Sequence, residues 1–330
     1  MTVRDLLTAR AETDRPGLRF EDREWSWRDV AAESAARSAA LAELLDPERP
    51  PHVAVLLDNV PEFAFTLGGA ALGGHVVVGL NSTRRGPALA ADLAHTDGQF
   101  VLTHAGLRDL LPSDLDVPVY DVDGTEWREL LDKHRGAPIA ERDVGPDDLL
   151  MLIFTSGTSG DPKAVRVTHT KVAYPGVMLA ERFGLGQDDV VYLAMPMFHS
   201  NAIMAGWAVG LAAGATIALE RKFSASGFLP AVRRFGATYA NYVGKPLAYV
   251  LATPEQPDDA DNPLRIVFGN EANERDIAEF ARRFGCTVVD SYGSTENAVI
   301  VQRQPDMPPG SLGWPVDGVK VLRPDGTETP

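Results

Sequence analysis

The sequence predicts an α/β fold with mainly parallel sheets that are covered by helices on both faces. Three observations support this fold: short apolar runs recur along the chain, helical segments separate them, and Gly or Pro stands at most junctions. The 330 residues are enough for two or three subdomains. We expect a large unit over residues 1–310, with two βα subdomains that divide near 150–190, and the start of a small β subdomain over 311–330.

The first half of the chain alternates between predicted strands and helices. Ser26 precedes a long Ala-rich segment as a helix N-cap does, and this helix is expected to continue through Leu45. A second helix is expected to begin at Pro61 and to end at the pair Gly73 and Gly74. The other elements expected here are strands at 52–57, 75–80, 99–104, 117–122 and 149–154 and a helix at 87–96.

The second half continues this alternation. Residues 202–219 carry no charge over 18 positions, which reaches the minimum length of a membrane-spanning helix. Because Gly214 stands where a helix would stop and a strand-like stretch follows, we expect a buried helix, a turn and a strand instead. Ser224 is expected to cap an amphipathic helix. The other expected elements are strands at 164–170, 190–196, 238–243, 264–269 and 286–290 and helices at 172–184, from Pro246 onward, and at 273–284.

The composition is that of an ordinary globular protein, with 45% hydrophobic and 23% charged residues. The net charge of −15 argues against nucleic acids and anionic membranes as partners, because both attract basic surfaces. Cys286 is the only cysteine, which excludes an intramolecular disulfide and indicates a reducing compartment. The N-terminus has no secretory apolar region. We therefore expect a cytoplasmic protein with small-molecule partners and no membrane span, and a homodimer stays open.

The segment FTSGTSGDPK, residues 154–163, follows a buried apolar run yet offers almost no side chain that could pack. Gly157 and Gly160 free the backbone, and the small hydroxyl side chains leave its N–H groups accessible. Together with the positive charge of Lys163, these groups are suited to hold phosphate oxygens. A Walker A loop is excluded, since that motif leads into a helix whereas AVRVTHT resembles a strand. On this segment alone, a plain Ser- and Gly-rich linker remains the alternative.

A second polar segment, DSYGSTENA at residues 290–298, follows another predicted buried strand. Ligands of α/β sheets bind at the carboxyl ends of parallel strands. Tyr292 offers an aromatic face for a nucleotide base, while Glu296 offers an oxygen ligand for Mg²⁺. FGNEAN at 268–273 ends a further strand and is expected to form the opposite wall. Taken singly, each of these features also fits a turn, a cap or a surface carboxylate.

In this order, the motifs TSGTSGDPK, PMFHSNA, GNEA and DSYGSTE resemble the adenylate-forming superfamily of acyl-CoA synthetases, peptide-synthetase adenylation domains and luciferases. The resemblance covers essentially the whole chain and is nearest to the fatty acyl-CoA synthetase branch. It implies an enzyme that joins a carboxylic acid to the α-phosphate of ATP, releases pyrophosphate and passes the acyl group to coenzyme A. Positioning and charge neutralisation would supply most of the rate.

The resemblance also implies roles for individual residues. Lys163, His199, Thr295 and Glu296 would act in catalysis, with Glu296 holding Mg²⁺. The residues that would bind the nucleotide are Thr155, Ser156, Gly157, Thr158, Ser159, Gly160, Lys163, Asn270, Glu271, Ala272, Asp290, Ser291, Tyr292, Gly293, Ser294 and Thr295. The residues that would line the acid pocket are His199, Met204, Trp207, Tyr242, Gly244 and Val299. The apolar ones fit the core equally well, and His199 alone also fits the start of a helix.

The sequence departs from the family pattern in two places. Ala164 follows Lys163 where the family usually has glycine. The Thr-Gly-Asp motif for ribose, the hinge and the C-terminal domain with its catalytic lysine are not found, so the isolated chain is expected to be weakly active or inactive. Other functions stay open: activation of a different nucleophile such as nitrite, or nucleotide and acyl binding without turnover. A Ser–Lys amidohydrolase is disfavoured, because the only lysine upstream of the loop, Lys133, stands in a polar stretch.

Overall fold

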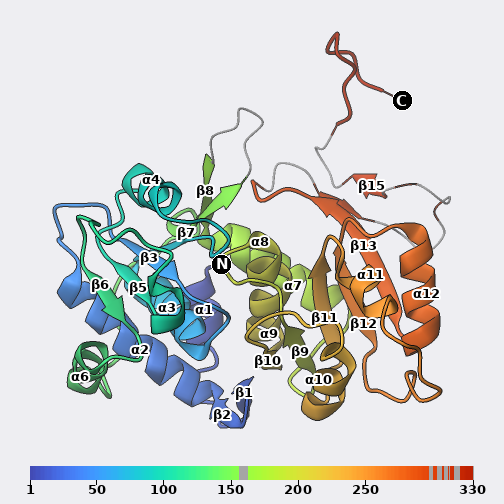
Figure 1. Ribbon diagram of the computed structural model, residues 1–330, viewed down its shortest axis with the longest axis horizontal. Helices are drawn as coiled ribbons and strands as arrows, with labels where there is room; N and C mark the ends of the chain where they lie inside the picture. Colours follow the sequence, from blue (N-terminus) through green and yellow to red (C-terminus); the bar gives the residue numbers. More distant parts are fainter. Residues whose placement is uncertain are drawn as a thin grey trace.

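The computed structural model of the chain describes residues 1–155, 163–296, 300–302, 307, 311, 313–315 and 320–329. Two sheets stand side by side, with helices between them and on their outer faces (Figure 1). Most neighbouring strands within each sheet run parallel. The predicted α/β class with mainly parallel sheets is therefore confirmed.

The first sheet is built from the N-terminal half of the chain. In spatial order, its described strands are β6 (Val119–Asp121), β5 (Val101–Thr103), β3 (His52–Leu56), β4 (Val76–Gly79), β7 (Leu149–Thr155) and β8 (Lys163–Thr168). All run parallel except β8, which returns antiparallel to β7. The helices of this half are α1 (Val3–Thr8), α2 (Trp27–Leu44), α3 (Pro61–Gly73), α4 (Pro87–His95), α5 (Ala105–Arg108) and α6 (Thr125–Lys133).

The second sheet is wider. In spatial order, its described strands are β15 (Trp314–Pro315), β14 (Ile300–Gln302), β13 (Thr287–Gly293), β12 (Ile266–Asn270), β11 (Tyr239–Val243), β9 (Val190–Leu193), β10 (Thr216–Leu219), β1 (Pro16–Phe20) and β2 (Arg23–Ser26). The strands from β13 to β1 are parallel, and β2, β14 and β15 are antiparallel additions at the two edges.

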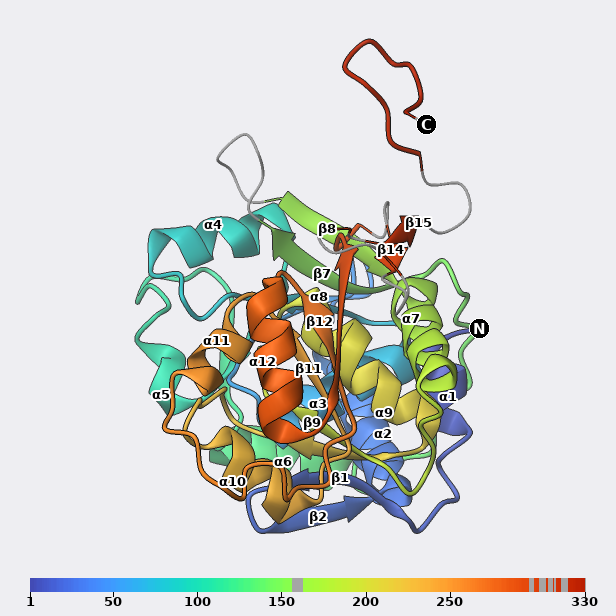
Figure 2. The same cartoon turned by 90° about the vertical axis from the view of Figure 1, so that its right-hand side faces the viewer.

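Helices cover both faces of this second sheet (Figure 2). One face packs against α7 (His169–Arg182) and against a continuous stretch made of α8 (Ser200–Ala202), the π-helix η1 (Ile203–Trp207) and α9 (Ala208–Ala213). The other face packs against α10 (Phe228–Phe235), α11 (Pro246–Leu251) and α12 (Glu274–Phe284). The apolar runs predicted as strands therefore lie in the core, between two helical layers.

Local sequence signals account for several element ends. The Ser26 hydroxyl accepts the Asp29 backbone N–H at the start of α2, and the Asp29 carboxylate accepts the Ser26 N–H, which is a capping box. Pro61 occupies the first turn of α3, and Gly74 ends that helix with a left-handed φ of 67°. These predicted boundaries are confirmed.

Other expectations differ from the structure. The helix α10 begins at Phe228, and the Ser224 hydroxyl instead accepts the Gly227 N–H at 3.2 Å in the preceding turn, so the prediction that Ser224 caps this helix is wrong. The hairpin of β1 and β2 was not expected, and it joins the second sheet because β1 pairs with β10. The strand β13 continues to Gly293 rather than ending at Asp290. The division of the chain near 150–190 and the small β subdomain over 311–330 stay predictions.

The uncharged segment at residues 202–219 folds largely as expected. It forms a helical stretch that ends at Gly214, which has a left-handed φ of 68°, and then continues into β10. Throughout the described part of the chain, no helix has both the length and the apolar character needed to cross a membrane.

Candidate active site

A cavity of about 590 Å³ opens at the carboxyl ends of the neighbouring parallel strands β11, β12 and β13. Val243, Asn270 and Ser291 contribute to its wall and are paired in register across these strand ends. Open parallel sheets bind their ligands at this edge. The cavity brings together most of the described residues that were predicted to bind a nucleotide.

Asparagine side chains connect the strand ends at this edge of the sheet through hydrogen bonds. Asn270 donates from Nδ2 to the carbonyl of Ser291 at 2.6 Å and to its hydroxyl at 3.1 Å. Asn201 in α8 donates to the Tyr242 carbonyl at 2.9 Å, and Asn241 donates to Asn201 Oδ1 at 2.7 Å. The strand ends and the start of α8 are thus held together by hydrogen bonds, which orders the polar wall before a ligand binds.

Asp290 is fixed from two sides. Its Oδ2 accepts the hydroxyl of Tyr242 and the backbone N–H of Ala272, the latter at 3.0 Å. Burial, together with the hydrogen bond to this carboxylate, raises the pKa of Tyr242, so that its hydroxyl stays a donor at neutral pH. Tyr242 is only 2% exposed and is not among the residues that line the cavity. Tyr242 therefore holds Asp290 in place from within the core and does not line the cavity, although it was predicted as an acid-pocket residue.

The polar wall of the cavity also presents an aromatic ring and hydroxyl groups. Tyr292, at the end of β13, lines the cavity and is 48% exposed, as a stacking surface for a base requires. The Thr295 hydroxyl lies 2.9 Å from that of Ser200. Ser294 Oγ is buried and has no hydrogen-bond partner among the described residues. Because an unpaired buried hydroxyl is unfavourable, a polar ligand atom would suit this position. The donor set therefore fits a nucleotide with its phosphate oxygens.

The predicted phosphate loop falls mostly outside the described residues, which leave out Ser156, Gly157, Thr158, Ser159 and Gly160. Thr155 lines the cavity and pairs with the exposed Lys163 across the two antiparallel strands β7 and β8. The chain after the loop is a strand and not a helix, which confirms that the segment is no Walker A loop.

His199 lines the cavity just before α8, and its ring packs on that of Phe198 with a centroid distance of 4.6 Å. Burial lowers the pKa of His199, which favours the neutral imidazole at pH 7. Glu271 also lines the cavity, and its backbone has a left-handed φ of 72°. Strained conformations of this kind concentrate at functional sites.

Glu296 is exposed and is not among the described residues that line the cavity. Across the described ranges, no group of three or more His, Cys, Asp and Glu side chains could hold a metal ion by itself. A magnesium ion here would need oxygen ligands from the nucleotide phosphates as well. The role of Glu296 as a magnesium ligand stays a prediction.

The other end of the cavity is apolar. Its wall is formed by side chains from α7, η1 and β12, namely Pro175, Met178, Leu179, Met204, Ala205 and Phe268. Of the predicted pocket residues, Met204 lies in this wall. Trp207 is buried in the core and, like Gly244, is not in the described lining, while Val299 lies outside the described residues.

A comparison with known protein families matches residues 7–330 to the family of AMP-binding enzymes. The chain belongs to this family. The match confirms the resemblance to adenylate-forming enzymes that the four motifs indicated, and it includes all the site residues described above.

Relatives of this AMP-binding enzyme include two acyl-CoA ligases. It is 55% identical over 327 residues to the medium/long-chain-fatty-acid–CoA ligase FadD17 of Mycobacterium tuberculosis, with 99% of this chain and 64% of that protein covered. It is 46% identical over 330 residues to the steroid-22-oyl-CoA synthetase of Rhodococcus jostii, with 98% of this chain and 59% of that protein covered. The chain thus spans less than two thirds of the length of these relatives.

Solved structures support the same fold. VinN superimposes with a TM-score of 0.83 at 25% identity, covering 100% of this chain and 85% of that one. The O-succinylbenzoate coenzyme A synthetase of Bacillus subtilis, in complex with AMP, gives a TM-score of 0.79 at 26% identity, covering 98% and 84%. The N-terminal domain of FACL13 from Mycobacterium tuberculosis gives 0.83 at 22% identity, covering 99% and 86%, and shows the fold alone.

Some residues that line the cavity of this AMP-binding enzyme were not predicted. Ser200 and Asn201 belong to the PMFHSNA motif, so the motif itself could have indicated them. Pro175, Met178 and Leu179 lie on one helix, and nothing in the sequence separates apolar residues that face a cavity from those that face the core.

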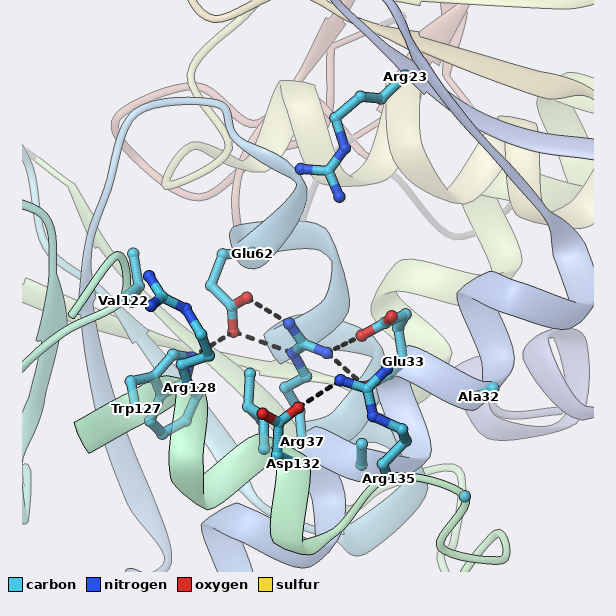
Figure 3. Close-up of a pocket in the computed structure, with 13 residues that line it drawn as sticks. Arg23, Ala32, Glu33, Arg37, Glu62, Val122, Trp127, Arg128, Asp132 and Arg135 are labelled. Carbon is cyan, nitrogen blue, oxygen red and sulfur yellow. Dashed lines mark hydrogen bonds and ion pairs between the residues drawn. The ribbon is translucent and has the colours of Figure 1, made fainter. Parts of the chain in front are cut away.

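A second cavity, of about 370 Å³, lies among α2, α3 and α6, on elements that do not carry the site (Figure 3). The guanidinium of Arg37 forms ion pairs with Glu33 and Glu62, and Glu62 also accepts the indole N–H of Trp127 at 3.1 Å. Asp132 pairs with Arg135. Because these acidic groups have basic partners within the protein, we interpret the cluster as a network that joins the three helices.

Proposed function

We propose that this chain forms the nucleotide- and acid-binding part of an AMP-forming acid–thiol ligase that makes acyl-CoA. The observation that carries the proposal is a single cavity with a polar wall at the ends of β12 and β13 and an apolar wall from α7 and η1. A reaction between a nucleotide and an apolar acid requires both walls to face one space.

The proposed reaction has two steps. A carboxylate oxygen of the acid attacks the α-phosphorus of ATP, the bond from that phosphorus to the bridging oxygen breaks, and pyrophosphate leaves. The thiol sulfur of coenzyme A then attacks the acyl carbonyl carbon, the thiol proton passes to a base, and AMP leaves with the acyl oxygen. The protein's part is mainly to position these groups and to neutralise their charge.

Individual residues have assigned tasks in this proposal. Tyr292 stacks on adenine, and Asp290 meets the edge of the base. Thr295 contacts the α-phosphate, while Thr155 and Lys163 hold the outer phosphates together with the loop between them. Further nucleotide contacts come from Asn270, Glu271, Ala272, Ser291, Gly293 and Ser294. Mg²⁺, held by Glu296, would offset phosphate charge that the acidic protein could not otherwise accommodate.

The relatives support an apolar acid as the substrate. FadD17 is named for medium- and long-chain fatty acids, and the other relative for a steroid acid. The apolar wall of this cavity suits either an aliphatic chain or a fused-ring body. We propose such an acid, coenzyme A as the acceptor, and the cytoplasm as the location, where Cys286 stays a free, buried thiol.

The test is pyrophosphate release by the full-length protein with octanoate, palmitate and a steroid side-chain acid, combined with mass spectrometry of the acyl-CoA products. We expect acid-dependent pyrophosphate release and the matching thioester. If no acid gives pyrophosphate above the acid-free control, the proposed function is wrong.

A further inference from the structure

We propose that Tyr239 sets the length and bulk of the acid that this cavity accepts, because it holds in place the π-helical turn that forms part of the apolar wall. This inference rests on the proposed function and adds a specificity-determining residue that does not itself line the cavity. Four features of the structure carry it.

The first feature is the shape of the wall. The helical stretch over residues 200–213 changes to π geometry in η1, where the Ala208 N–H bonds to the carbonyl of Ile203, five residues earlier. Such turns are rare and are frequently found at functional sites. Met204 and Ala205 lie in this turn, and both line the cavity. The position of the turn therefore decides how much space remains for the acyl chain.

The second feature is a buried hydrogen bond to the centre of this turn. Tyr239 in β11 is 0% exposed, and its hydroxyl donates to the carbonyl oxygen of Ala205 at 2.8 Å. Asn241 stands two residues further along and thus on the same face of the strand, where it donates to Asn201 Oδ1 at 2.7 Å. The strand β11 therefore holds both the start of α8 and the middle of η1.

The third feature is the ring of Tyr239, which supports another part of the wall. It packs on Phe183 with a centroid distance of 6.1 Å, and Phe183 packs on Phe268 at 5.8 Å. Phe268 lines the cavity. Burial raises the pKa of Tyr239, so its hydroxyl remains a hydrogen-bond donor at neutral pH.

The fourth feature gives the direction of the effect. Gly206, next to Ala205, lies so close to the sheet that an added Cβ would stand 2.6 Å from Leu193 Cδ1 and 3.0 Å from Asn241 Oδ1. The sheet side of η1 is thus already tightly packed. A turn released from Tyr239 should relax toward the cavity, where it would take space from the acyl chain.

The experiment compares chain-length profiles in the full-length protein. Tyr239→Phe keeps the ring and removes the hydroxyl. We expect KM for the longest or bulkiest accepted acid to rise about fivefold relative to KM for octanoate. This factor corresponds to the net free energy of one hydrogen bond. KM for ATP and kcat with octanoate should stay within about twofold of the wild type, because the nucleotide wall does not depend on this bond. Tyr192→Phe is the matched control: this buried tyrosine on β9 packs on Phe228, away from the cavity lining.

A second variant, Phe183→Leu, tests the ring contact at a half-buried position and keeps the test informative if Tyr239→Phe does not fold. We expect it to disfavour long acids in the same direction. The proposal is overturned if the folded variants lose activity equally with all acids, or if their profiles match that of Tyr192→Phe. A wild-type protein that releases no pyrophosphate with any acid would instead refute the proposed function, and this inference with it.

Discussion

Lys163 begins β8 with an exposed side chain, opposite Thr155 of the cavity wall. Its substitution by alanine removes a charge but few packing atoms. We expect Lys163→Ala to shift the melting temperature by less than about 2 °C, as exposed substitutions usually do. Pyrophosphate exchange should fall at least about tenfold, because a positioned charge at the phosphates is lost. The control is Lys222→Ala, at another exposed lysine. A large loss of stability with normal exchange would contradict the assignment.

Tyr242 offers a second test at the residue scale, since its buried hydroxyl holds the Asp290 carboxylate. A hydrogen bond to a charged group contributes about 1.5–3 kcal/mol, so Tyr242→Phe should lower the free energy of unfolding by about this amount. Because Asp290 then loses one of its constraints, we expect ATP affinity to fall about fivefold, with KM for the acid unchanged. Calorimetric titration with ATP measures this, with Tyr192→Phe as the control. Unchanged ATP affinity would make Tyr242 a core residue only.

From the sequence, the chemical role of a residue is easier to predict than whether its side chain faces the cavity or the core. The order of motifs predicted that polar residues would gather around a nucleotide, and the cavity contains Asn270, Tyr292 and Thr295. The acid pocket was harder to predict, because an apolar or aromatic residue type is compatible with both a pocket and the core. Tyr242 and Trp207 are examples, since both are buried in the core.

At the scale of elements, local sequence signals predicted where several helices and strands begin or end, but they did not predict which distant strands pair. The capping box of α2, the glycine after α3 and the strand β8 all depend on residues close in sequence. The pairing of Leu18 with Ile217 joins strands far apart in the chain, so no local sequence pattern indicates it. The π turn η1 was expected as ordinary helix, because its geometry depends on contacts with β11 and α7 that the sequence does not reveal.

The contact between α7 and α9 leads to a prediction at this scale. A Cβ on Gly176 of α7 would stand 2.6 Å from the carbonyl oxygen of Ala208 at the start of α9. Gly176→Ala should therefore push the two helices apart and cost about 1–3 kcal/mol of stability. Because Pro175 lines the cavity, KM for the acid should change as well. Gly186→Ala is the control, with open space around its added Cβ. Equal stability of the two variants, measured by denaturant unfolding, would contradict this packing.

At the scale of the whole molecule, the order of the cavity walls depends on the packing of the two sheets and of the helices between them. The cavity takes residues from both, with Phe154 and Thr155 from the first sheet and Phe268 and Asn270 from the second. Conditions that loosen this packing should therefore affect the site before the sheets themselves separate. Buried histidines indicate one such condition.

His75 and His169 are buried, and burial lowers the pKa of each to about 4. In the unfolded chain both titrate near 6.5, so the unfolded state binds more protons between these two values. The contribution of these two histidines to the free energy of unfolding should thus be constant above pH 6.5 and fall as the pH drops toward 4, by on the order of 3 kcal/mol for each histidine. His169→Leu replaces a ring whose nitrogens have no hydrogen-bond partner among the described residues. In this variant, we expect the unfolding free energy to change less steeply with pH between 4 and 6.5, by the equivalent of about one fewer proton bound on unfolding. Urea unfolding at several pH values measures this dependence. An unchanged slope would show that His169 does not resist protonation in the folded state.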